Sequence, residues 1–160
     1  MSFSDADMRY MAVALEEAES AAEHGDVPVG AVVVCNGEIV ARSHNTKELD
    51  RTAVGHAEIC AIRQACERLN RWRLTDCTLY VTLEPCPMCT GAILSARIPR
   101  VVAGAKDAVA GAMGSVWALH RAPSPLGECE VVYGCLEEEC RGLLQTFFKE
   151  RRPCSEKTAK

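Results

Sequence analysis

The sequence predicts an α/β protein in which helices pack on a mixed β-sheet. Two features lead to this prediction: an early β-hairpin signal, and an alternation of strand-like and helix-like segments after it. A hairpin joins antiparallel strands, whereas strands separated by helices usually run parallel. The expected fold is therefore an α/β sandwich with a mixed sheet.

The composition is that of one globular domain. The chain has 160 residues, of which 48% are apolar and 25% are charged, and we expect the domain to span residues 1–152. Residues 153–160 begin with a helix-ending proline and are expected to form a disordered tail. The acidic N-terminus is unlike a signal peptide, and the apolar run at 29–35 is too short to cross a membrane. We therefore expect a cytoplasmic protein with no membrane partner.

The first expected element is a helix that ends near His24. Ser4, followed three residues later by Asp7, is typical of an N-terminal cap. The apolar residues that then recur at helical spacing are Met8, Met11, Ala12, Leu15 and Ala18.

A β-hairpin is expected next. The dipeptide Asn36-Gly37 favours a two-residue turn, and residues 29–35 and 38–44 flank it as strands. A polar loop follows at 45–55.

The remaining elements alternate in type. Residues 56–69 have helical periodicity, and residues 78–84 alternate like a buried strand. Residues 86–96 are expected to form a short helix, in which Pro87 suits the first turn because its missing N–H costs nothing there. The other expected elements are a strand at 100–105, a glycine-rich loop at 107–115, a strand at 131–133 and a closing helix at 136–152.

Ten cysteines would suggest disulfides in a secreted mini-protein, but this chain is long enough to build its own core. Most lie in apolar segments, where a reduced thiol behaves as a small hydrophobic group. Those expected to be of this kind are Cys35, Cys60, Cys66, Cys77, Cys135 and Cys140.

Cys86 and Cys89 differ from the others because their spacing is that of metal ligands. Residues three apart project from one face of a helix, and the start of a helix stabilises thiolates, the form that binds metal. His56, thirty residues earlier at the start of another expected helix, supplies a third ligand. A Cys₂His set leaves a fourth tetrahedral position for water, which is typical of catalytic zinc.

Glu58 supplies a carboxylate for proton transfer beside this site. Deamination requires water to lose a proton, and the ring nitrogen and the leaving amine each to gain one. Because residues two apart do not share a helical face, His56 and Glu58 can converge only if the helix begins there. The alternative is a structural zinc site completed by another cysteine, with Glu58 exposed to solvent.

The combination His-x-Glu and Pro-Cys-x-x-Cys is the signature of zinc-dependent nucleobase deaminases. To about residue 152 the chain also resembles the bacterial tRNA-specific adenosine deaminases of the cytidine deaminase-like superfamily. The stretches that carry this resemblance are 27–32, 56–59, 79–86, 89–93, 97–102, 104–107, 111–115 and Phe147-Phe148.

The resemblance implies a three-layer α/β/α sandwich with a five-stranded mixed sheet, and one zinc ion per subunit where two helix N-termini meet. It implies a homodimer that converts adenosine to inosine at the wobble position of tRNA-Arg by binding the anticodon loop. The segment 117–130, with His120 and Cys129, matches poorly and receives no role.

The resemblance also assigns roles to single residues. His56, Cys86 and Cys89 resemble the zinc ligands, and Glu58 resembles the catalytic proton shuttle. The residues expected to bind the substrate are Asn45, the backbone N–H of Ala57, Val27, Pro28, Asp107 and Phe148.

Two further functions stay open at this point. A deaminase of a free base or nucleotide, such as guanine, cytosine or dCMP, would use the same metal site. A non-catalytic zinc module is the third possibility. The net charge of −4 argues against broad attraction to nucleic acid, so an RNA partner would be bound by a local patch or by the pocket.

Overall fold

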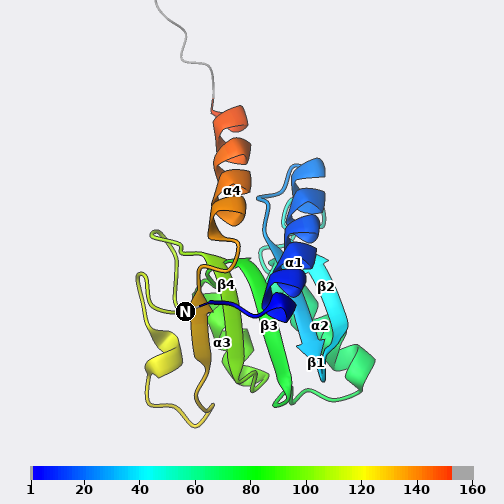
Figure 1. Cartoon of the computed structure of the whole chain (residues 1–160), viewed down its shortest axis with the longest axis vertical. Coiled ribbons are helices and arrows are strands. Elements are labelled where there is room, and N and C mark those ends of the chain that lie inside the picture. The colour runs from blue at the N-terminus through cyan, green and yellow to red at the C-terminus, as the bar shows by residue number, and fades with distance from the viewer. Residues whose placement is uncertain (1, 153–160) are drawn as a thin grey trace, which may run out of the picture.

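The structure, a computed structural model, describes residues 2–152, which form four α-helices around one five-stranded sheet (Figure 1). The helices are α1 (Asp5–Glu23), α2 (Ala57–Leu69), α3 (Pro87–Ser95) and α4 (Glu137–Arg151). The strands are β1 (Gly30–Cys35), β2 (Glu38–His44), β3 (Cys77–Leu83), β4 (Arg100–Ala105) and β5 (Glu130–Tyr133). A 3₁₀ turn, η1 (Leu119–Arg121), precedes β5 and is not predicted by the sequence pattern.

The sheet is mixed, as predicted. Its strand order is β2-β1-β3-β4-β5. β1 pairs antiparallel with both β2 and β3, whereas β3, β4 and β5 run parallel. A helix separates β3 from β4 in the sequence, and a long connection separates β4 from β5. Strands joined in this way are expected to run parallel.

The sheet is covered on both faces, so the three-layer arrangement is confirmed. One face packs against α2 and α3 through alternate strand residues such as Val33 and Leu79. The other face packs against α1 and the start of α4 through the intervening residues, such as Val32 and Tyr80. This alternation is the two-residue period of a strand that is buried on both sides.

Helix α1 is fixed at its start and packed tightly along its length. The Ser4 hydroxyl accepts a hydrogen bond from the Asp7 N–H, and the Asp7 carboxylate accepts one from the Ser4 N–H, which is the predicted cap. Gly30 allows the helix to approach β1, because a Cβ there would lie 1.8 Å from the Ala14 carbonyl oxygen.

The predicted hairpin turn is confirmed. Asn36 and Gly37 have φ angles of 50° and 79°, which a type I′ turn requires. The register shifts between Val33 and Val34, which pair with Ala41 and Ile39, so the extra residue, Val40, lies on β2.

The predicted helices and strands all occur, with boundaries that differ by at most one residue. The cysteine prediction is only partly right: Cys60 and Cys66 are half-buried, whereas the other four of that group are buried. The expected tail at 153–160 lies outside the described residues. Within residues 2–152, no helix is both long and apolar enough to cross a membrane.

Candidate active site

His56 lies just before α2 and not within it. It is the N-cap residue, with an extended backbone (φ −80°, ψ 146°), and its side chain makes no capping hydrogen bond. The imidazole is therefore free to point into the cavity beside the helix, while Glu58 belongs to the first helical turn. This break in the helical geometry lets two residues that are two apart face one site.

Cys86 and Cys89 occupy the start of α3 in the same manner. Cys86 is the N-cap residue, with an extended backbone and no capping hydrogen bond from its side chain, and Pro87 opens the helix. The prediction that both thiols lie within the first turn is therefore wrong by one residue. Cys89 does lie in that turn and is completely buried.

The three expected ligands converge on one point. His56 Nδ1 lies 3.6 Å from Cys86 Sγ and 3.4 Å from Cys89 Sγ. In a tetrahedral zinc site with Zn–S of about 2.3 Å and Zn–N of about 2.0–2.1 Å, nitrogen and sulfur ligands lie about 3.6 Å apart. The donor set and its spacing therefore fit a zinc ion.

The two thiols differ in protonation. A hydrogen bond from Cys89 lowers the pKa of the Cys86 thiol to about 4, against the effect of burial, and a hydrogen bond from His56 adds to the lowering. Cys86 is thus held as a thiolate, the form that binds a metal ion. The hydrogen bond to Cys86 and burial raise the pKa of the Cys89 thiol, which must lose its proton to bind a metal.

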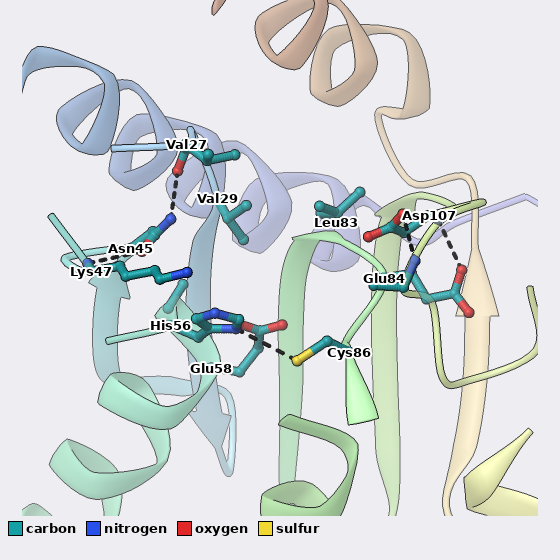
Figure 2. A pocket seen from close by; sticks show the side chains of 12 residues that line it. Val27, Val29, Asn45, Lys47, His56, Glu58, Leu83, Glu84, Cys86 and Asp107 are labelled. Atoms are coloured by element: carbon teal, nitrogen blue, oxygen red, sulfur yellow. Dashed lines mark hydrogen bonds between the residues drawn. The ribbon is translucent and has the colours of Figure 1, made fainter. Parts of the chain in front are cut away.

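Glu58 lies beside these ligands and is almost completely buried, with 4% of its surface exposed. Burial disfavours the charged carboxylate and raises its pKa to about 7. A carboxyl group with such a pKa can both accept and donate a proton near neutral pH. Figure 2 shows its carboxylate next to His56 and Cys86, facing the cavity.

The cavity has a volume of about 210 Å³. It lies where β1 begins and β3 ends, between the starts of α2 and α3 (Figures 1 and 2). The lining residues are Val27, Val29, Asn45, Lys47, His56, Ala57, Glu58, Leu83, Glu84, Cys86, Asp107 and Ala110.

Four of the six expected substrate-binding residues line this cavity. They are Val27, Asn45, Ala57 and Asp107. Pro28 is buried and is not among the lining residues; its neighbour Val29 is. Phe148 lies on α4, outside the cavity, and half of its surface is exposed.

Asn45 is held in place by two hydrogen bonds of its side chain. Its amide nitrogen donates to the Val27 carbonyl oxygen at 3.2 Å, and its amide oxygen accepts from the Lys47 N–H at 3.0 Å. The second of these is the turn that asparagine commonly makes after a strand. The side chain is therefore oriented before any substrate enters.

Glu84 is a lining residue that the sequence analysis misses. Its carboxylate accepts hydrogen bonds from the N–H groups of Asp107, Met113 and Ser115, from the Ser115 hydroxyl and from the Tyr133 hydroxyl. Burial alone would raise its pKa, but these donors outweigh burial and lower it. Glu84 is thus a buried anion that fixes the 107–115 loop. A glutamate at the end of an apolar strand, directly before Pro-Cys, is the signal that could have pointed to it.

The 107–115 loop approaches Glu84 closely. A Cβ on Gly111 would lie 2.4 Å from a Glu84 carboxylate oxygen, so only glycine fits there. Asp107 accepts hydrogen bonds from the N–H groups of Val109 and Ala110, which completes a turn at the cavity wall.

A groove of about 430 Å³ continues from the cavity toward α4. It shares Val27, Asn45 and Lys47 with the cavity and is also lined by Phe147 and Arg151. Phe147 is buried under the Arg151 guanidinium, whereas Phe148 points outward. Only one phenylalanine of this pair therefore packs in the interior.

Known proteins resemble this chain over most of its length. A family model described as the cytidine and deoxycytidylate deaminase zinc-binding region matches residues 4–105, which include His56, Glu58, Cys86 and Cys89. The tRNA-specific adenosine deaminase of Bacillus subtilis (strain 168) is 49% identical over 146 residues, or 91% of each chain.

Two solved structures also resemble this chain. One, from a study of A-to-I editing by tRNA:A34 deaminases at the wobble position of transfer RNA, is 43% identical with a TM-score of 0.82 and covers 85% of this chain and 99% of its own. A guanine deaminase from Nitrosomonas europaea is 25% identical with a TM-score of 0.72, over 88% of this chain and 83% of its own. The chain therefore belongs to the cytidine and deoxycytidylate deaminase family, among the tRNA-specific adenosine deaminases.

Proposed function

We propose that this protein hydrolyses adenosine to inosine at the wobble position of tRNA, with tRNA-Arg as the substrate. The observation that carries the reaction type is a buried Glu58 beside a converging His56, Cys86 and Cys89 in one cavity. The similarity to tRNA-specific adenosine deaminases supports adenosine in RNA over a free base.

His56, Cys86 and Cys89 hold the metal, one zinc ion per chain. When bound, zinc supplies a water molecule of lowered pKa as the nucleophile. Glu58 would accept one proton from the water and deliver it to N1 of the purine, and would then accept the proton of the new C6 hydroxyl and deliver it to the leaving amino group. Water adds at C6, the C6–N bond breaks, and the products are inosine and ammonia.

The walls of the cavity orient the base. The N–H of Ala57, at the start of α2, faces the cavity and reads the edge of the purine. Val27 contacts the face of the base, and Asn45 holds the flipped nucleotide. Extrusion is inexpensive because anticodon-loop bases are not paired.

The RNA beyond the target base is bound locally. Asp107 lies at the cavity wall and contacts a neighbouring nucleotide, while the exposed ring of Phe148 offers a surface on which an unpaired base can stack. The net charge of −4 is consistent with such a limited contact area. We also propose that the enzyme is a homodimer and acts in the cytoplasm on mature tRNA.

The decisive test is an assay on an anticodon stem-loop of tRNA-Arg with adenosine at the wobble position. The zinc-loaded protein is incubated with this RNA, which is then digested to nucleosides. We expect inosine from the wild type and none from Glu58→Ala, which should retain the fold and the zinc. Wild-type rates in Glu58→Ala would refute the mechanism. Absence of inosine from the folded, zinc-loaded wild type would refute the substrate and direct attention to guanine.

A further inference from the structure

A second group of metal-ligand side chains lies at the opposite end of the sheet from the cavity. Cys35 is the last residue of β1, Cys77 is the first residue of β3, and the two pair directly across the β1–β3 ladder. Asp76 immediately precedes Cys77. Leu83, at the other end of β3, lines the cavity. At about 3.3 Å per strand residue, the group lies roughly 20 Å from that end.

The donor atoms of this group are already close together. The two Sγ atoms and one carboxylate oxygen of Asp76 all lie within 4.8 Å of one another. Cys77 Sγ lies 3.6 Å from Asp76 Oδ1. Sulfur and oxygen ligands of one tetrahedral zinc ion, with Zn–S of about 2.3 Å and Zn–O of about 2.1 Å, are also about 3.6 Å apart. The spacing therefore matches that of ligands on a single ion.

A cationic side chain already contacts this group. Arg71 Nη2 donates to Asp76 Oδ1 at 2.5 Å and lies 3.8 Å from Cys35 Sγ. The guanidinium therefore binds a carboxylate and a sulfur of the same set, which indicates a position that attracts positive charge. The Arg71 side chain is 36% exposed and belongs to the connection between α2 and β3. It can turn toward solvent without moving either strand.

The two cysteines of this group are buried, whereas its aspartate is exposed, so an ion can enter from the aspartate side. Cys35 and Cys77 are 7% and 1% exposed, so the sulfurs are shielded from bulk water. The Asp76 side chain is 43% exposed and forms the solvent side of the group. Two sulfur donors select thiophilic ions over magnesium and calcium, which prefer oxygen ligands.

We propose that Cys35, Cys77 and Asp76 form a second metal site, distinct from the catalytic one, for a thiophilic divalent cation such as Zn²⁺ or Cd²⁺. Binding displaces the Arg71 guanidinium, releases the two thiol protons to solvent and leaves the fourth position to water. The bound ion ties the end of β1 to the start of β3, the central antiparallel pair of the sheet.

The test counts metal on the zinc-loaded protein under reducing conditions. Cd²⁺ is added in excess, unbound ions are removed by gel filtration, and total zinc plus cadmium per chain is measured. We expect two ions per chain in the wild type and in Cys66→Ser, a matched control whose thiol lies outside the group. We expect one in Cys35→Ser and in Cys77→Ser, since one thiolate is lost in each. Arg71→Gln should bind the second ion at a lower Cd²⁺ concentration, because the guanidinium no longer competes with the ion for Asp76.

Asp76→Asn tests the same site without the risk that a buried cysteine substitution disturbs the fold, because the Asp76 side chain is exposed and does not pack between strands. It too should lose the second ion, while deaminase activity and the first ion remain in every variant of this group. A wild type that takes one ion in total, or cysteine variants that still take two, would overturn the proposal. Deaminase activity depends on the catalytic site alone. If no second ion is found, the proposed function is therefore unaffected.

Discussion

Two glutamates that line the same cavity, Glu58 and Glu84, have pKa values shifted in opposite directions. Burial raises the pKa of Glu58 to about 7. For Glu84 the effect of burial is outweighed by the Ser115 hydroxyl and by backbone N–H donors, and its pKa is lowered. Glu58 can therefore exchange a proton near neutral pH, whereas Glu84 stays charged and serves to hold a loop.

Glu84→Gln should weaken substrate binding without loss of metal. The amide cannot accept five hydrogen bonds, and each bond to a charged group contributes about 1.5–3 kcal/mol. We expect kcat/KM for the stem-loop to fall about tenfold or more, chiefly through KM, because the 107–115 loop loosens. Zinc content should be unchanged. Steady-state kinetics beside the exposed control Glu138→Gln will measure this, and an unaltered KM would contradict the role assigned to Glu84.

Only those site residues that form short sequence motifs could be predicted from the sequence. Cys86 lies three residues from Cys89, and His56 lies two residues from Glu58. Each of these two pairs is a recognisable motif in the sequence. Glu84 has partners 23 to 49 residues away. No sequence period connects it with them, and only the fold brings them together.

At the scale of elements, the contact between α1 and β1 depends on the absence of one side chain. In Gly30→Ala the new Cβ would meet backbone atoms of Ala14 and Ala18 at 1.8 and 2.6 Å, and backbone cannot rotate aside. We expect a loss of about 3 kcal/mol or more, at the upper end for overpacked cores. Gly142→Ala in α4 is the matched control, since its Cβ would meet nothing within 4 Å. Urea denaturation measures both, and equal stability of the two variants would contradict this packing.

The start of α1 should govern stability in acid. Burial would raise the pKa of Asp7, but hydrogen bonds from Arg100, Tyr80 and Ser4 outweigh it and lower the pKa to about 2 from an ordinary value of 3.8. A lowered folded-state pKa stabilises the protein above pH 4, and this contribution is lost as the pH falls toward 2. Asp7→Asn should therefore be less stable than wild type at pH 7 by about 1–3 kcal/mol. The difference should shrink between pH 4 and 2, as urea denaturation at each pH would record. A constant difference would contradict the assignment.

At the scale of the whole molecule, the proposed zinc ligands connect helices that are distant in sequence. His56 caps α2, Cys86 caps α3, and Cys89 lies in the first turn of α3, beyond the central strand β3. Zinc bound there stabilises the folded state by mass action, by about 2.7 kcal/mol at a hundredfold excess over Kd. Removal of zinc with a chelator should lower the melting temperature by roughly 5–10 °C for a chain of this size. Glu58→Ala should show the same decrease, and an unchanged melting temperature would argue against binding at these residues.

The elements of the fold were predictable because their signals are short-range. The Asn36-Gly37 turn, the Ser4 cap and the alternation of strands need only a few neighbouring residues. The η1 turn has no such periodicity, and its position depends on contacts of the segment between β4 and β5. The pattern alone predicts five strands, whereas the helices on both faces of the sheet were implied by the family resemblance.

The bare caps of α2 and α3 have a consequence for protein engineering. Aspartate or serine at an N-cap position commonly stabilises a helix by about 1 kcal/mol, and neither His56 nor Cys86 provides such a bond. A search for thermostable variants would favour both substitutions on local grounds, and each would remove a metal ligand. Stability and activity are thus in direct conflict at these two positions, and selection for heat resistance alone should yield folded but inactive chains.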